Sequence, residues 1–385
     1  MSRGYRSGNH IVRRISITLA VLCVLAGILL AIILPNISIN DANLKVLRIP
    51  FTDQFILLEN APFNDPSQVE AKPADTEEPV RPVEGTTYQE RIERAVFLPY
   101  HLMFDPAAVD AFLASIGGQE VNTVVIEVKS PSGALAFASQ NPLSEGASAE
   151  SNEPLLALKT KLNEAGYAVV ASFSCFRDNA LSKSHEEFGL KNQDGALWGD
   201  SMRYAWLDPY SEDVQVYLLS LLSELYDLGF HEILLQNLSF PIGTDTNLIL
   251  YDEGKDTEAE KQTRIDQFLF QLGSFAADRA ELSLSVRFDA AEGQSMQSFA
   301  NSFYRIYLPL SSGESGGIDH TPITEFSALL GEGTLPYRFV ALISLSERTS
   351  NEAFAMKAET ADYGIGYYFE SQDGGYDPLL FQTNE

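Results

Sequence analysis

Strand-like and helix-like patterns alternate along the chain from Arg91 onward, and this alternation constrains the fold more than any other feature. The strand-like patterns are short apolar runs rich in β-branched and aromatic residues, at residues 95–100, 121–129, 167–176, 232–240, 282–288, 305–310, 339–345 and 364–370. The helical patterns lie at residues 107–115, 155–165, 212–228, 257–279, 323–330 and 351–361. Eight strands alternating with helices over about three hundred residues predict an α/β fold, a closed parallel TIM (β/α)8 barrel.

Signatures of cofactor and metal binding are missing from the sequence. A doubly wound open sheet is the alternative to the barrel, but no Gly-rich first turn of the dinucleotide-binding type occurs. The five histidines are scattered without the spacing of metal ligands. The two cysteines, Cys23 and Cys175, lie in predicted apolar segments and do not indicate a disulfide framework. We therefore expect no cofactor and no metal.

A long loop follows the third predicted strand. The strand ends at Arg177 and Asp178, and the loop carries Trp198 and Trp206, the two tryptophans of the chain. It closes at residues 208–211, Asp-Pro-Tyr-Ser, just before a strongly periodic helix. A loop of this length inside a compact domain is either disordered or functional, and its aromatic and charged content favours a functional loop.

Three segments of the chain resemble a known family. They read VNTVVIEVKSPSGALAF at residues 121–137, FRDNALSKSHEEFGLKNQDGALWGDSMRYAWLDPYS at residues 176–211, and LGFHEILLQNLSFP at residues 228–241. In this order they resemble a family of bacterial (β/α)8 barrels that are described as glycoside hydrolases of unknown activity and belong to an α-amylase-like clan. The resemblance implies the barrel fold and a carbohydrate ligand.

The N-terminal region predicts a membrane anchor. Residues 1–14 are basic and contain no acid, and residues 15–34 run about twenty residues without a charge, enough to cross a bilayer as a helix. Basic residues before the span place the N-terminus in the cytoplasm and the barrel outside the cell. A cleaved signal peptide is the alternative, but the apolar run is long and no clear cleavage site follows. We therefore expect an uncleaved, single-pass signal-anchor in the cell membrane.

The rest of the chain divides into two parts. Residues 35–90 form a juxtamembrane segment and a stalk rich in proline and acidic residues, a composition that buries no core and stays extended. Residues 91–385 form the barrel. The chain has 53 acidic and 26 basic residues, a formal net charge of −27, so we expect it to repel the phosphates of nucleic acid. Anionic cell-wall polymers are disfavoured for the same reason.

Polar residues gather at the carboxyl ends of the predicted strands, where a TIM barrel carries its site. They are Glu127, Lys129, Arg177, Asp178, Gln236, Asn237, Arg287, Asp289, Tyr368 and Glu370. Residues two apart share one face of a strand, so Glu127 and Lys129 lie close enough to pair. Such a rim suits a sugar, and aromatic rings would supply flat apolar platforms. The candidate platforms are Trp198, Trp206, Tyr210 and Tyr368.

Each of these residues also has a purely structural interpretation. Arg287 and Asp289, like Glu127 and Lys129, can form buried ion pairs inside the barrel. For Trp198 and Trp206, anchoring the loop and contacting a ligand are equally compatible with the sequence. Asp208 can serve as a cap or turn residue instead of a substrate-binding one, and Ser211 suits the N-cap of the following helix.

The chain departs from the family pattern where that pattern carries acids. In the resembled family the fourth strand ends with an acidic residue, for which this chain has Gln236, and an arginine follows, for which it has Ser239. The acid after Lys129 is replaced by Ser130, and the arginine of the third strand by Ser172. The barrel pattern is retained, but the chemistry of its rim has changed.

Hydrolysis of a glycosidic bond needs two carboxyl groups, and a glutamine side chain carries no negative charge. The first hypothesis is therefore a catalytically degenerate, membrane-anchored barrel that binds a cell-envelope glycan or an envelope protein. The second is an active glycoside hydrolase with a rearranged carboxylate pair, with Glu127 and Asp178 as the candidate catalytic residues. The third is a structural envelope protein.

Overall fold

The computed structural model describes residues 37–39, 45–48, 55–58 and 91–382, apart from residues 244, 313–316, 332 and 347. The chain divides into two compact units, Met1–Thr76 and Glu77–Glu385. The predicted cytoplasmic tail and transmembrane segment, residues 1–34, lie outside the described residues, as does the predicted stalk from residue 59 to residue 90. Among the residues that the structure describes, no helix has both the length and the apolar character needed to cross a bilayer.

The first unit contains a small antiparallel sheet in the order β1–β2–β3. Its strands are β1 (Ile37–Ile39), β2 (Lys45–Arg48) and β3 (Phe55–Leu58). Ile37 lies opposite Leu47, and Lys45 lies opposite Leu58. The sheet falls within the segment predicted as juxtamembrane, for which the sequence predicted no strands.

The second unit is a closed barrel of eight parallel strands. In chain order these are β4 (Arg94–Leu98), β5 (Thr123–Lys129), β6 (Ala168–Ser174), β7 (Glu232–Gln236), β8 (Ser283–Arg287), β9 (Ile306–Pro309), β10 (Phe339–Ser344) and β11 (Gly366–Glu370). Each strand pairs with its sequence neighbour, and β11 closes the barrel on β4 with Tyr367 opposite Arg94. The predicted eight-stranded parallel barrel is confirmed.

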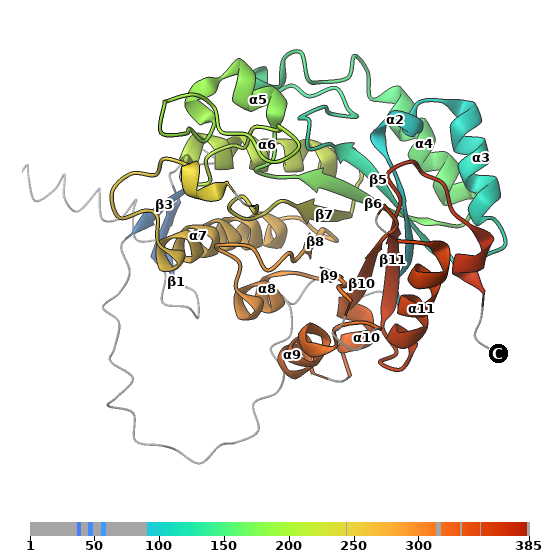
Figure 1. The fold of residues 1–385 in the computed structure, drawn as a ribbon. Helices are drawn as coiled ribbons and strands as arrows, with labels where there is room; N and C mark the ends of the chain where they lie inside the picture. The colour runs from blue at the N-terminus through green and yellow to red at the C-terminus, as the bar shows by residue number, and fades with distance from the viewer. Residues whose placement is uncertain are drawn as a thin grey trace, which may run out of the picture. The chain divides into compact units, whose positions relative to one another are not determined.

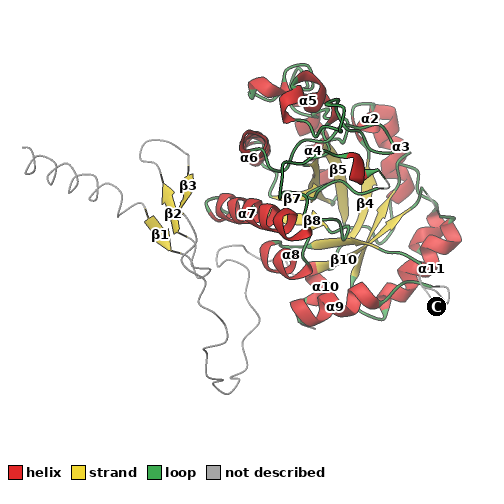
Figure 2. Ribbon diagram, turned by 60° about the vertical axis from the view of Figure 1, so that its left-hand side comes forward, coloured by secondary structure: helices red, strands yellow, loops and turns green. Residues whose placement is uncertain are grey.

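Helices surround the strands, as Figures 1 and 2 show. They are α2 (Tyr100–Met103), α3 (Pro106–Ile116), α4 (Glu153–Glu164), α5 (Asn179–Ser184), α6 (Glu212–Asp227), α7 (Glu258–Ala277), α8 (Met296–Ser302), α9 (Thr321–Leu330), α10 (Leu335–Arg338) and α11 (Ser350–Ala361). The six predicted helices are confirmed. The four that the sequence did not predict, α2, α5, α8 and α10, have four to seven residues, which is too short for a helical period to show.

Two separate apolar cores result from the closed sheet. The inner core fills the barrel with alternate residues of the strands, namely Ala95, Phe97, Val125, Val170, Leu234, Tyr307, Val340, Leu342 and Tyr368. The residues between them, such as Val96, Ile233 and Leu235, belong to the outer core together with buried side chains of the helices. Because both faces of each strand are buried, the strand sequences are nearly continuous apolar runs.

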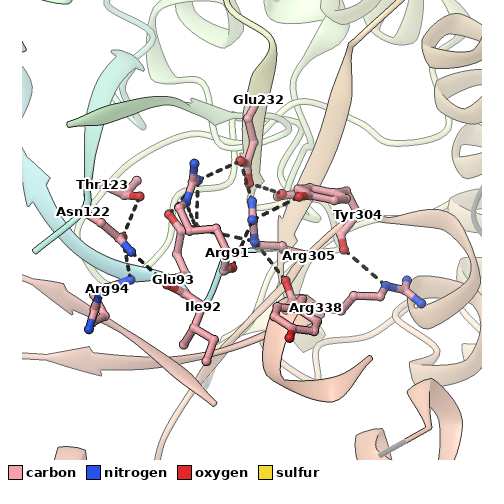
Figure 3. A network of polar contacts seen from close by, with 12 residues as sticks. Arg91, Ile92, Glu93, Arg94, Asn122, Thr123, Glu232, Tyr304, Arg305 and Arg338 are labelled. Carbon is pink, nitrogen blue, oxygen red and sulfur yellow. Dashed lines mark hydrogen bonds and ion pairs between the residues drawn. The ribbon is translucent and has the colours of Figure 1, made fainter. Parts of the chain in front are cut away.

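A network of buried charges closes the amino end of the barrel (Figure 3). The Arg305 side chain, just before β9, is fully buried and donates from Nη1 to Glu232 Oε2 at 2.6 Å. Its Nε lies 3.5 Å from Glu93 Oε2 and donates to the carbonyl of Tyr337. Arg91 donates to Glu93 at 2.9 Å and lies 3.5 Å from Glu232. Two arginines and two glutamates thus join the beginnings of β4, β7 and β9.

The two arginines and two glutamates of this network stabilise each other's ionised forms. Burial by itself raises the pKa of the Glu232 carboxyl, but the positive charges of Arg305 and Arg91 and the hydrogen bond from Ser285 together lower it. Burial lowers the pKa of Arg305, and the charges of Glu232 and Glu93 raise it further than burial lowers it. Removal of one partner therefore leaves an uncompensated buried charge.

We expect Arg305→Leu to destabilise the domain by about 3–5 kcal/mol, because Glu232 and Glu93 lose their buried counter-charge. Arg94→Leu is the matched control, since the Arg94 side chain is 43% exposed and lies 3.8 Å from Glu120. We expect this control to change stability by less than about 1 kcal/mol. Denaturant unfolding of both variants measures the difference, and equal losses would contradict a stabilising role for the network.

Acid should weaken the same network. The stabilising contribution of Glu232 is complete above its unfolded pKa of about 4.3 and is lost as the pH falls through its lower folded pKa. We therefore expect the unfolding free energy of the wild type to fall more steeply between about pH 5 and pH 2 than that of Glu232→Gln. Parallel pH profiles of the two proteins would show that the Glu232 carboxylate carries no such contribution.

Candidate functional site

The interior of the barrel becomes polar at its carboxyl end. Besides Ser174 of β6 and Ser344 of β10, strand alternation places five polar side chains on the inward face, above the inner core. These are Glu127 of β5, Ser172 of β6, Gln236 of β7, Arg287 of β8 and Glu370 of β11. We call this set the polar centre. Its carboxylate, amide, hydroxyl and guanidinium groups come from five strands and converge on one end of a rigid scaffold.

Arg287 crosses the interior of the barrel to hold Glu370. Its Nη1 donates to both carboxylate oxygens of Glu370, at 3.3 and 3.2 Å, although β9 and β10 lie between β8 and β11 in the sheet. Its Nε donates to Asp289 Oδ1 at 2.7 Å. Burial lowers the pKa of Arg287, but the charges of Glu370 and Asp289 raise it overall. The predicted pair of Arg287 and Asp289 is thus confirmed, and Glu370 extends it.

Glu127 differs from the other acids of the polar centre. Its side chain is half-buried, and its Oε2 accepts a hydrogen bond from the backbone N–H of Tyr100 at 3.0 Å. Burial raises the pKa of the Glu127 carboxyl; the Tyr100 hydrogen bond opposes this shift, and the negative charge of Glu370 adds to it. Among the described residues, no ion pair involves Glu127. Glu127 is therefore an acid of the polar centre that has no cationic partner among the described residues.

Gln236 occupies the end of the fourth barrel strand, where the resembled family has an acid. The side chain is half-exposed, and its Nε2 donates to the Ser172 hydroxyl at 2.7 Å. The next residue, Asn237, has a φ of 53° and lies with its Oδ1 2.9 Å from the Ser174 hydroxyl. The two positions at which the family has charged residues, Gln236 and Ser172, are hydrogen-bonded to each other as neutral groups.

Lys129 and Asp178 form a buried ion pair beside the polar centre. Lys129 Nζ lies 2.7 Å from Asp178 Oδ2, and neither side chain is more than 1% exposed. Asp178 also caps α5 by accepting from the N–H of Leu181. The expected pairing of Lys129 with Glu127 is wrong, because the strand register shifts between these two residues. The geometry gives Asp178 a structural role.

The long loop after β6 is ordered around one carboxylate. Asp200 Oδ2 accepts from Arg177 Nε at 2.6 Å and from Trp206 Nε1 at 3.1 Å. Trp198 donates its ring N–H to the backbone carbonyl of Asp245. Trp198 and Trp206 are 5% and 2% exposed, so both anchor the loop and neither presents a ring face to solvent. The Arg177 guanidinium is held by Asp200 and the Tyr204 ring.

The remaining candidate residues lie apart from the polar centre or beneath it. Asp208 accepts from the N–H of Tyr210, so it is a turn residue as anticipated, and burial raises the pKa of its carboxyl. The Tyr210 hydroxyl donates to the carbonyl of Lys255, and its ring packs on Phe240. Tyr368 is fully buried in the inner core. Within the described part of the chain, none of these three side chains is hydrogen-bonded to the polar centre.

Two aromatic residues near Glu127, Tyr100 and Phe104, were not among the site residues that the sequence predicted. Tyr100 lies two residues after the end of the first barrel strand and donates its backbone N–H to Glu127, while its ring is half-buried. The Phe104 ring meets it edge-on at 5.6 Å between centroids and is 40% exposed. Both belong to or flank the short helix α2, which no sequence period indicated. The hydrogen bond from Tyr100 to Glu127 ties this aromatic pair to the polar centre.

A cavity of about 500 Å³ opens at the other end of the barrel. Its lining includes Arg91, Glu232 and Arg305 of the buried charge network, together with Lys159 and Asn163 of α4. The charged groups of that network already satisfy one another, and active sites of TIM barrels lie at the carboxyl end. We therefore place the candidate site at the polar centre. Among the described residues, no three metal-ligating side chains cluster, and the expectation of no metal stays a prediction.

The buried pair beside the polar centre yields a stability prediction. Asp178→Asn retains a side chain able to cap α5 but leaves Lys129 as an unpaired buried cation, so we expect a loss of about 3–5 kcal/mol in unfolding free energy. Asp110→Asn is the matched control, because Asp110 is 70% exposed in its pair with Lys161. Urea unfolding compares the two variants, and a similar, small effect for both would refute the structural assignment of Asp178.

Comparison with known proteins agrees with this geometry. A family model described as "Putative glycosyl hydrolase domain" matches residues 95–290, half of the chain. The catalytic domain of β-amylase from Paenibacillus polymyxa superposes with a TM-score of 0.53 at 10% identity, covering 74% of this chain and 95% of that one. For α-L-fucosidase isoenzyme 2 from Paenibacillus thiaminolyticus the TM-score is 0.54 at 15% identity, covering 76% and 48%.

A hypothetical protein from Ruminiclostridium thermocellum is 23% identical over 50% of this chain and 96% of its own length, with a TM-score of 0.43. At these identities the structural likeness shows the fold alone. A comparison with curated proteins found no match. The family match covers β4 to β8, including four of the five residues of the polar centre. The chain therefore belongs to this family of glycosyl hydrolase domains.

Proposed function

We propose that the barrel binds a cell-envelope glycan at its polar centre. The observation that carries this proposal is the convergence of Glu127, Gln236 and Arg287, all half-exposed, at the carboxyl end of a glycosyl-hydrolase-type barrel. A sugar presents many hydroxyl groups, each able to donate and accept hydrogen bonds, and these three side chains supply both kinds of partner from rigid strands. Tyr100 and Phe104 supply aromatic surface at the edge.

The proposal includes the loss of one catalytic route. Gln236 takes the place of the family's fourth-strand acid, and its amide donates to Ser172. A neutral amide can neither attack the anomeric carbon as an anion nor offset the positive charge that develops there. We therefore propose that the barrel is degenerate with respect to a mechanism that uses this acid.

We further propose that the domain works outside the cytoplasm, anchored in the cell membrane through residues 15–34. The sequence supports this placement through the basic residues 1–14, the uncharged run that follows, and the acidic remainder of the chain. The buried Cys175, whose pKa burial raises to about 12, is compatible with an oxidising environment because its thiol is unreactive. An envelope protein is the second candidate partner for such an anchored domain.

Retention on insoluble cell-wall glycan tests the binding proposal. Full-length protein in mild detergent should be retained, and Gln236→Ala should weaken retention by about tenfold, since it removes a side chain that can hydrogen-bond the sugar. The matched control is Asn163→Ala, which deletes an exposed amide in the amino-end cavity and should bind like the wild type. If the control lost binding and Gln236→Ala did not, the sugar site would lie at the amino end. Lack of any retention would leave the protein-partner and structural hypotheses.

Membrane anchoring has its own test. We expect the full-length chain to stay with the membrane fraction after an alkaline wash that removes peripheral proteins, because a spanning apolar helix is held by the bilayer itself. Protease added outside intact cells should remove the barrel. A deletion of residues 15–34 should release the chain from the membrane, and unchanged fractionation of that deletion would contradict the anchor.

A further inference from the structure

We infer that the polar centre selects glycans that carry free amino groups, namely hexosamine units without an N-acetyl group. The inference rests on the proposed glycan binding and adds the class of sugar to it. Three observations carry it: the excess of acids in and beside the polar centre, the polar atoms that the protein leaves unused there, and the acidity of the whole chain.

The acids in and beside the polar centre outnumber the cations there. Arg287 donates from Nη1 to both oxygens of Glu370, at 3.3 and 3.2 Å, and from Nε to Asp289 at 2.7 Å. One guanidinium is thus shared between two carboxylates, and Glu127 adds another carboxyl group from β5. An excess of negative charge favours a ligand that brings a positive charge.

Two cations at the neighbouring strand ends do not remove this excess. Lys129, at the end of β5, lies with its Nζ 2.7 Å from Asp178, and both side chains are buried. Arg177, after β6, donates from Nε to Asp200 at 2.6 Å. Because each of these cations has an acid of its own, neither supplies a counter-charge to the polar centre.

Glu127 is the group that binds the amino group. Its Oε2 accepts from the Tyr100 N–H at 3.0 Å, whereas its Oε1 has no hydrogen-bond partner among the described residues and is not one of their enclosed polar atoms. Burial raises the pKa of the Glu127 carboxyl, and the negative charge of Glu370 raises it further. An ammonium group at Oε1 offsets both effects, because it stabilises the carboxylate form.

Two further polar atoms suit the hydroxyl groups of the same sugar. Gln236 donates from Nε2 to Ser172, and its Oε1 has no partner within the described part of the chain. Arg287 Nη2 is unused by the same described residues, and the Arg287 side chain is 25% exposed. The polar centre therefore offers one acceptor and one donor besides Glu127, and a sugar hydroxyl can bond to either kind.

A buried hydroxyl beside these groups also lacks a partner. Tyr368 is fully buried, and its Oη makes no hydrogen bond to any described residue. The side chain shares the inward face of β11 with Glu370, two residues further on. Burial raises the pKa of this hydroxyl and the charge of Glu370 adds to the rise, so the hydroxyl lies near Glu370. Since buried polar groups are nearly always satisfied, an unsatisfied one here indicates that a further polar group completes the site.

The charge of the whole chain acts in the same direction. With 53 acidic and 26 basic residues, the chain attracts a polycationic glycan and repels an anionic one. At physiological ionic strength this attraction is screened beyond about 8 Å. It does not depend on the polar centre, so the contact with Glu127 needs a control of equal charge.

The test compares one glycan in two chemical forms. Insoluble cell-wall glycan freed of peptide is de-N-acetylated with alkali in one portion and fully N-acetylated with acetic anhydride in another. Full-length protein in mild detergent should bind the de-N-acetylated form at least about tenfold more tightly, because a charge-assisted hydrogen bond is added. Equal retention on the two forms would overturn the inference and leave the proposed glycan binding intact, whereas absence of retention on both would remove both proposals.

Glu127→Gln should weaken binding to the de-N-acetylated form by about tenfold and to the N-acetylated form by less than about threefold. The new amide oxygen can still accept from the Tyr100 N–H, and binding to the N-acetylated form shows that the variant is folded. Glu325→Gln, at an exposed position of α9, is the matched control and should change neither. If both variants weakened binding equally, the preference would come from net charge alone and the inference would be wrong.

Two further measurements define the amine and the acid. Beads that carry aminohexyl chains should retain the wild type and Glu127→Gln equally; retention there that depends on Glu127 would indicate a site for protein amines and overturn the assignment to a glycan. The wild-type preference for the de-N-acetylated form should decrease in acid as Glu127 takes up a proton. An identical decrease in Glu127→Gln would show that another acid, such as Glu370 or Asp289, holds the amine.

Discussion

Closure of the sheet is the constraint from which the rest of this structure follows. When β11 pairs with β4, both faces of the eight strands are removed from water, and every inward side chain must find its partners inside the barrel. Apolar residues and two buried tyrosines fill the middle, with the rings of Tyr307 and Tyr368 meeting edge-on at 5.6 Å. Charged residues of the described barrel interior lie at the two ends of this core, and the two ends differ in how these charges are paired.

The charged side chains at the amino end of the barrel are paired with one another, whereas those at the carboxyl end are not all paired. At the amino end, Arg91 and Arg305 face Glu93 and Glu232. At the carboxyl end, Arg287 holds Asp289 and Glu370, and no ion pair of the described residues includes Glu127. A balanced network leaves no charged group for a ligand to satisfy. The carboxyl end leaves Glu127 without a cationic partner among the described residues, and this difference directs the proposed glycan site to the carboxyl end.

The presence of Gln236 in place of the family's fourth-strand acid is consistent with this difference in charge pairing between the two ends. Gln236 and Ser172 are neutral and satisfy one another, so the loss of charge at these two places costs the barrel no buried ion pair. The two acids of the polar centre instead lie on β5 and β11, the strands that flank β4. The acids of the polar centre thus lie on a different wall of the interior from the family's fourth strand.

The sequence by itself determined the strands, the six longer helices and the inward positions of the site. Strand and helix periods are local, so the pattern at β7 places Gln236 inward and the serine before α6 marks its N-cap. The acids and amides at the strand ends could be recognised in the same way. For such features, the residues that decide them are neighbours in sequence.

Only the tertiary structure decided which partner each of those side chains takes. The shift of register after Glu127 gives Lys129 to Asp178, and Arg287 reaches a strand three places away in the sheet. Asp200 accepts a hydrogen bond from the ring N–H of the buried Trp206, so this tryptophan anchors the loop, which is one of the two roles that the sequence allowed. Pairings of this kind depend on barrel closure and on distances between segments remote in sequence, and no local pattern records them.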